Sequence, residues 1–126
     1  MSLENDVKKF YEEKGIMITA LDDYQKEAGK TAIFPAEHKV VYPALGLASE
    51  AGEVAGKVKK ILRDQKGKFS DEQLEILAAE IGDVLWYCAV LAEDCGFTLS
   101  HIANKNIAKL QSRKQRGVLQ GSGDTR

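Results

Sequence analysis

The sequence has little proline, cysteine or tryptophan and no excess of either charge. Its 126 residues include two prolines, two cysteines, one tryptophan and two histidines, and the net charge at pH 7 is −1. A nearly neutral chain lacks the overall positive charge that is typical of proteins that bind nucleic acids or anionic membranes. No apolar run approaches the ~20 residues that span a bilayer, and the N-terminal segment with Glu4 and Asp6 does not resemble a secretory signal. We therefore expect a cytoplasmic protein without a nucleic-acid or membrane partner.

The two cysteines predict free thiols. Cys88 and Cys95 are seven residues apart in one expected helix, which separates them by about 10 Å along its axis. This separation is too large for a disulfide. We interpret both residues as buried thiols of a protein from a reducing compartment.

The composition is that of a single globular domain spanning residues 1–126. Hydrophobic residues make up 44% of the chain and charged residues 29%, which is too apolar for a disordered chain. A chain of this length can form one ordinary hydrophobic core but not two. The segment 117–126 stands apart because it is rich in glycine, and it ends a basic stretch that begins at Lys105.

Helical periodicity dominates the chain and predicts an all-α fold. Both prolines lie in the first third, and β-branched alternation is limited to a hint at residues 39–42. Apolar residues recur at helical spacing after Pro43, which suits the first turn of a helix ending near Leu62. Ser70 and Gln73 form a capping-box pattern at the next helix start. The expected helices cover about 3–13, 20–30, 43–62, 71–95 and 99–115.

Two acidic pairs are the most informative feature of the sequence. Glu50 and Glu53 are three residues apart, as are Glu80 and Asp83, so each pair projects from one face of its helix. Each pair lies at the same edge of the apolar stripe of its helix, and each is about ten residues from the polar connector. An antiparallel hairpin over about residues 44–95 would bring the four acids to one height.

Four carboxylates at one height would repel one another unless a cation lies between them. All-oxygen ligation without histidine or thiolate suits Mg²⁺, with Mn²⁺ as an alternative, better than zinc. The competing interpretation is a solvated acidic face. Ile76, Val84 and Tyr87 flank Glu80 on its helix, which is a poor setting for a solvated acid.

These motifs resemble the metal-binding signature of the all-α nucleoside triphosphate pyrophosphohydrolases of the MazG type. The signature is E-x-x-E, a spacer of 26 residues (54–79), and E-x-x-D. The resemblance extends from about residue 42 to the C-terminus, and its other matching segments are Gly46-Leu47, Val58-Lys59-Lys60, Gly82-Asp83-Val84-Leu85-Trp86-Tyr87 and Asn106-Ile107-Ala108-Lys109-Leu110.

The resemblance implies a MazG-type helical bundle, built on an antiparallel helix hairpin and completed by formation of a homodimer or homotetramer. It also implies Mg²⁺-dependent cleavage of a nucleoside triphosphate between the α and β phosphates. The products would be a nucleoside monophosphate and pyrophosphate, which fits a role in cleaning the nucleotide pool. Glu50, Glu53, Glu80 and Asp83 are the expected metal ligands, and Glu53 is our choice for the general base by analogy alone.

Basic residues near the C-terminus are the expected phosphate contacts. Lys109, Arg113 and Arg116 share one helical face, and Arg126 ends the chain. Arginine suits bidentate phosphate binding, and the backbone N–H groups of 121–123 suit an anion. The alternative is an ordinary solvated basic face followed by a frayed tail. Lys57 and Lys60 follow the first acidic pair, and a role limited to offsetting the acids' repulsion also stays open for them.

Recognition of the base is assigned to Trp86 and Asn106. Trp86 adjoins Asp83 and could stack on a base, although such aromatic residues are more often part of the core. Asn106 offers a donor and an acceptor to a base edge.

A different class of function also fits the amphipathic helices. A non-catalytic oligomerisation or regulatory module would explain the helices and the glycine-rich tail. It does not explain two matched acidic pairs at the edge of the core.

Overall fold

A computed structural model describes residues 3–126, and all of its regular structure in that range is helical. The α-helices are α1 (Leu3–Glu13), α2 (Leu21–Gly29), α3 (Val41–Gln65), α4 (Asp71–Asp94) and α5 (Leu99–Gln115), with a 3-10 turn at Ala36–His38. The prediction of an all-α chain is confirmed, and residues 1 and 2 of the expected domain lie outside the described residues. The hint of a strand at 39–42 is wrong, because Val41 and Tyr42 already belong to α3.

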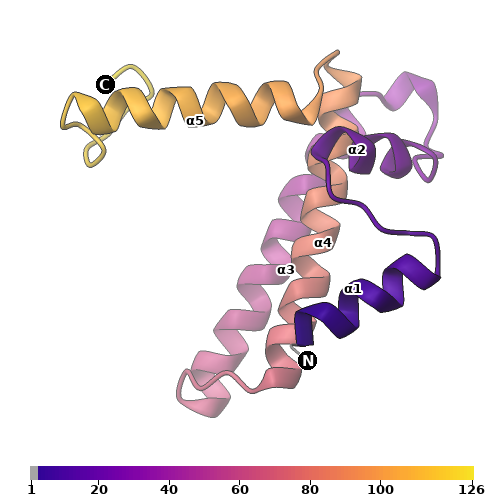
Figure 1. Cartoon of the computed structure of the whole chain (residues 1–126). Helices are drawn as coiled ribbons and strands as arrows, with labels where there is room; N and C mark the ends of the chain where they lie inside the picture. Colours follow the sequence, from indigo (N-terminus) through magenta and orange to yellow (C-terminus); the bar gives the residue numbers. More distant parts are fainter. Residues whose placement is uncertain (1–2) are drawn as a thin grey trace.

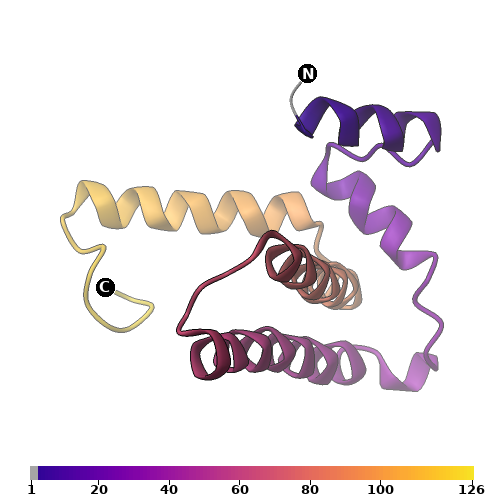
Figure 2. The same cartoon turned by 90° about the horizontal axis from the view of Figure 1, so that it is seen from below.

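The centre of the molecule is an antiparallel hairpin of the two long helices, α3 and α4, which lie side by side (Figures 1 and 2). The predicted capping box is present: Ser70 Oγ accepts from the Gln73 N–H, and Gln73 Oε1 accepts from the Ser70 N–H. Helix α3 runs three residues beyond the expected end at Leu62. It stops where Lys66 and Gly67 adopt positive φ angles of 55° and 74°, a left-handed ending that favours glycine.

Helix α2 holds the junction between α4 and α5 through one buried side chain. Gln25, only 6% exposed, donates from Nε2 to the carbonyl oxygens of Ala89 and Phe97 and accepts at Oε1 from the Leu99 N–H. A buried amide satisfied on both sides fixes the three elements in one arrangement. Asp22 adds a second link, since its carboxylate accepts from the N–H and the hydroxyl of Ser100 in the first turn of α5.

The buried core is small and lies at this junction. Its buried members are Ala28, Ala89, Ala92 and Leu99, and the partly buried Tyr24 and Trp86 pack against them. Among the described residues, α1 belongs to none of the well-packed helix pairs, which are α3–α4, α2–α4, α2–α5 and α4–α5. Helix α5 projects away from the hairpin (Figure 1).

Many large apolar side chains therefore remain exposed in the isolated chain. On α1 and the hairpin helices they are Val7, Phe10, Tyr11, Val41, Tyr42, Leu45, Leu62, Leu74, Ile76, Ile81 and Leu85. An apolar surface spread over several elements is typical of a protein that associates with another chain. No helix within residues 3–126 combines the length and apolar character needed to cross a membrane.

Both cysteines are free, but only one is shielded. Cys88 is partly buried in α4, whereas Cys95 is exposed at the turn that follows this helix. The prediction of two buried thiols is therefore wrong for Cys95. The apolar face of α4 ends with the helix, and the chain turns outward at Gly96 with a φ of 82°.

Candidate metal centre

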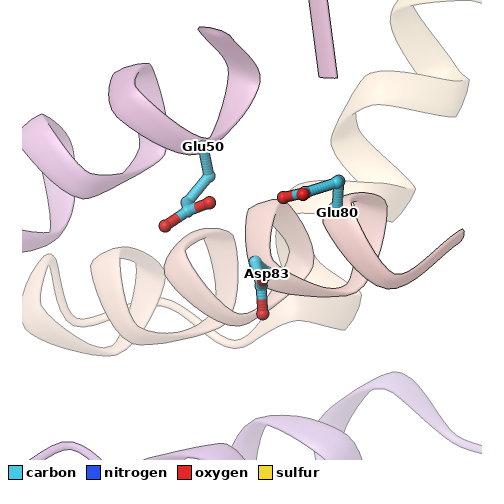
Figure 3. Close-up of side chains that lie close together, drawn as sticks. All are labelled: Glu50, Glu80 and Asp83. Carbon is cyan, nitrogen blue, oxygen red and sulfur yellow. The ribbon is translucent and has the colours of Figure 1, made fainter. Parts of the chain in front are cut away.

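Three carboxylates from the two hairpin helices converge on one point. Glu50 of α3 and the pair Glu80 and Asp83 of α4 each place a carboxylate oxygen within 4.8 Å of the others. Figure 3 shows Glu50 extending from α3 toward α4, where Glu80 reaches toward it. The antiparallel hairpin and its short connector produce this match in height, as the two acidic pairs predicted.

The electrostatics of the cluster are those of a site with an excess of negative charge. Partial burial raises the pKa of the Glu50 carboxyl, and the negative charges of Asp83, Glu80 and Glu53 raise it further. A raised carboxyl pKa means that the ionised form is disfavoured where it stands. A cation bound among these oxygens would reverse that penalty.

Glu53 does not join the group of three, although the sequence placed it with them. Its side chain is exposed, and it belongs to no cluster of acids in the described chain. Glu80 and Asp83 have the same three-residue spacing and both join, so the spacing is not the cause. The rotation of α3 about its axis turns Glu50 toward α4 and leaves Glu53 exposed. The expectation that all four carboxylates meet therefore holds for three of them. Glu53 lies close enough for its charge to act on Glu50.

One lysine contacts the cluster directly. Lys57 Nζ lies 3.6 Å from Glu80 Oε1, and this ion pair joins α3 to α4. The sequence indicated only that Lys57 follows the acids on the same helix. The contact itself depends on how the hairpin pairs the two helices.

The aromatic residues beside the acids are packed into the fold. Trp86 Nε1 donates to Thr31 Oγ1 at 2.8 Å, and its ring packs against the core. Tyr87 lies over Gly46, and Tyr42 stacks on Phe34 with ring centroids 4.7 Å apart. The alternative interpretation of Trp86 as a core residue thus describes its contacts in this structure, and base stacking by Trp86 stays a prediction.

The four expected phosphate contacts do not meet the acids within this chain. They lie on α5 and the C-terminal tail, and the far end of α5 projects away from the hairpin (Figures 1 and 2). Lys109 and Asn106 are exposed and line an apolar groove of about 780 Å³ between α4 and α5. Their roles toward phosphate and base stay predictions.

The three arginines of this set bind the tail instead. Arg113, only 5% exposed, donates to the Asp124 carbonyl oxygen, and Arg116 donates to that of Arg126. Arg126 in turn donates to the carbonyl oxygens of Val118, Leu119 and Gly123. The tail is consequently folded back on the end of α5, and the frayed tail of the alternative interpretation is wrong for this structure.

Two residues that organise the site were not among the site residues predicted from the sequence. The role of Gln25 depends on partners 64 to 74 residues away along the chain. Tyr24 lies near Asp83, whose charge raises the pKa of the Tyr24 hydroxyl after the larger effect of burial. Helix α2 thus supports the part of α4 that carries the acids.

Residues 42–118 match the model of the MazG nucleotide pyrophosphohydrolase domain. The chain belongs to the MazG nucleotide pyrophosphohydrolase family. It is also similar to the Gene 37 protein of Mycobacterium phage L5, with 49% identity over 112 residues that cover 84% of this chain and 98% of that protein. No solved structure matches the chain. The MazG segment begins at the second residue of α3 and ends after α5, so it contains Glu50, Glu80 and Asp83.

Proposed function

We propose that this protein is a divalent-metal-dependent nucleoside triphosphate pyrophosphohydrolase. The single observation that carries the proposal is the convergence of Glu50, Glu80 and Asp83 inside a MazG segment. Hydrolysis between the α and β phosphates yields a nucleoside monophosphate and pyrophosphate, a reaction suited to removing unwanted nucleotides. A non-catalytic module has no use for mutually repelling acids held between two helices.

The donor set fits a hard divalent cation. Glu50, Glu80 and Asp83 offer oxygen ligands without histidine or thiolate, which favours Mg²⁺ and then Mn²⁺. Partial burial and mutual repulsion already disfavour the ionised Glu50 carboxyl, so a cation bound there would lower the cost of ionising it. These three residues would hold the metal, which when bound neutralises phosphate charge and activates water for attack.

Glu53 is our proposed general base. Its carboxylate is exposed on α3, one turn from Glu50, and it is not committed to the group of three. In that position it can accept a proton from the attacking water as the new bond to the α phosphorus forms. The bond from the α phosphorus to the bridging oxygen breaks, and the electron pair leaves with pyrophosphate.

The phosphate contacts are proposed to come from a second copy of the chain. Lys109, Arg113, Arg116 and Arg126 lie on α5 and the tail that follows it. Because α5 projects from its own hairpin, we propose that these residues reach the acids of a neighbouring copy's hairpin. Arg113 is buried under the tail and reaches a phosphate only after the tail shifts. The exposed apolar residues of α1, α3 and α4 supply the surface for a homodimer, or for a homotetramer of two such dimers.

The assay that tests the proposal measures pyrophosphate release from each ribo- and deoxyribonucleoside triphosphate, with Mg²⁺ and with EDTA. We expect release that depends on Mg²⁺, and the triphosphate hydrolysed fastest identifies the preferred base. Asn106 and Trp86 are the proposed contacts to that base. No release from any triphosphate would favour the non-catalytic module. Analytical ultracentrifugation at micromolar concentration checks the assembly, and a compact monomer would contradict it.

A further inference from the structure

Lys57 lies at the edge of the acidic cluster and touches one of its members. Positions 50 and 57 are two turns apart on one face of α3, so Lys57 follows Glu50 along the side of the helix that meets α4. Its ammonium nitrogen is 3.6 Å from Glu80 Oε1, and the Glu80 side chain is only 17% exposed. Glu80 therefore lies beside two carboxylates, which repel it, and one lysine, which attracts it.

This contact gives the cluster its positive charge. Within residues 3–126, Lys57–Glu80 is the only ion pair that Glu50, Glu80 or Asp83 makes. Three carboxylates against one ammonium leave a net negative charge, which partly offsets but does not remove the repulsion among the acids. A divalent cation and the Lys57 ammonium would both bind the Glu80 carboxylate, so the two must compete for it.

Lys57 can leave Glu80 without burying its charge. Its side chain is 41% exposed. It also lines, with Lys60, a recess of about 180 Å³ between α3 and α4. The four-carbon stem of lysine is flexible and its ammonium is strongly hydrated. A hydrated position away from Glu80 is consequently within reach of the same residue.

We propose that Lys57 is a built-in counterion that occupies Glu80 in the metal-free protein and is displaced when a divalent cation binds. The inference rests on the metal centre proposed above and goes beyond it, since it concerns the state before the metal arrives. Lys57 adds to the stability of the hairpin in that state, and it makes the site bind metal less tightly than three bare carboxylates would.

The test compares Lys57→Met with Lys59→Met, which removes the same charge from an exposed lysine of the same helix. Lys59 forms no ion pair among the described residues. The affinity for Mn²⁺ and Mg²⁺ is measured by calorimetry, and the melting temperature is measured in EDTA and in excess Mg²⁺. We expect Lys57→Met to bind metal about fivefold more tightly or better. It should also melt below wild type in EDTA and gain more from Mg²⁺, whereas Lys59→Met follows wild type in each measurement.

Each result that contradicts the proposal rules out a different part of it. If wild type binds neither metal, the proposed metal centre is wrong, and the displacement of Lys57 is wrong with it. If wild type binds metal but Lys57→Met binds it equally or more weakly, the metal centre stands and the competition is refuted. If Lys57→Met and Lys59→Met melt alike in EDTA, Lys57 does not stabilise the metal-free hairpin. Lys57→Arg, which keeps the charge, should restore the wild-type melting temperature in EDTA.

Discussion

Gly46 and Tyr87 set how closely the two long helices approach: a Cβ on Gly46 would lie 2.1 Å from Cε1 of the Tyr87 ring. Only a residue without a side chain leaves room for the ring at this point of α3. The contact lies one turn before Glu50 on α3 and one turn after Asp83 on α4, so it also sets the spacing of the acids. The Tyr42 ring extends this contact toward the loop before α3, with its centroid 6.4 Å from that of Tyr87.

The substitution Gly46→Ala should therefore destabilise the hairpin. The new methyl group forces the Tyr87 ring or a helix to move, at a cost of about 1–3 kcal/mol in the free energy of unfolding. Gly52→Ala is the matched control, because a Cβ at that helical position meets no atom within 4 Å. It should stabilise α3 by roughly 0.5–1 kcal/mol. Urea denaturation measures both, and equal stability of Gly46→Ala and wild type would contradict the prediction.

Glu80→Gln tests the cluster through stability and activity together. In EDTA the variant should melt no lower than wild type, because relief of repulsion offsets the lost ion pair with Lys57. Mg²⁺ binds the folded cluster and should raise the melting temperature of wild type, a response that Glu80→Gln should largely lose. Pyrophosphate release should fall by orders of magnitude. Glu75→Gln, an exposed acid elsewhere on α4, should keep the rate and the response. If Glu80→Gln hydrolyses triphosphates as wild type does, the assignment of Glu80 is wrong.

The raised pKa of Glu50 predicts a pH dependence of stability in the metal-free protein. Between about pH 4.3, the ordinary value for glutamate, and the raised pKa of Glu50, this carboxyl binds more protons in the folded state than in the unfolded state. The contribution of Glu50 to the free energy of unfolding must therefore fall as pH rises through this window. Glu50→Gln removes that contribution, so its stability relative to wild type should increase with pH. Urea titrations in EDTA measure the difference, and parallel curves would refute the sign.

The tail offers a test of the basic residues. Deletion of residues 117–126 removes Arg126 and the carbonyl oxygens that bind the guanidinium groups of Arg113 and Arg116. The helices should remain, because the core lies at the other end of α5, and far-UV circular dichroism should keep its helical signal. We expect KM for the triphosphate to rise because Arg126, a proposed phosphate contact, is lost. Unchanged kinetics with an unchanged spectrum would mean that the tail has no part in substrate binding.

The two thiols should differ in their rates of alkylation. Burial raises the pKa of the Cys88 thiol, which lowers its reactive thiolate fraction, and the side chain is also partly shielded. Cys95 is exposed. With iodoacetamide at pH 8, mass spectrometry should find Cys95 modified well before Cys88, and the two rates should converge in denaturant. Equal rates in the native protein would contradict the burial of Cys88.

The local part of the structure was predictable because it depends on neighbouring residues. The helix start at Ser70 follows from a capping box closed within four residues, and the helices over 3–13 and 99–115 follow from periodicity. The end of α3 was missed by three residues, because a left-handed Lys66 has no strong sequence signal.

The sequence by itself determined the helices, the hairpin and the common height of Glu50, Glu80 and Asp83, because a short connector leaves antiparallel helices only one register. Tertiary structure alone decided that Glu53 stays outside the cluster and that Lys57 meets Glu80. Those outcomes depend on the rotation of each helix about its axis and on how closely the two helices approach. Packing between distant side chains sets both quantities, and no local pattern encodes them. The same holds for Gln25, whose partners lie far along the chain, and for Arg113, whose guanidinium could be placed only once the tail had folded back over it.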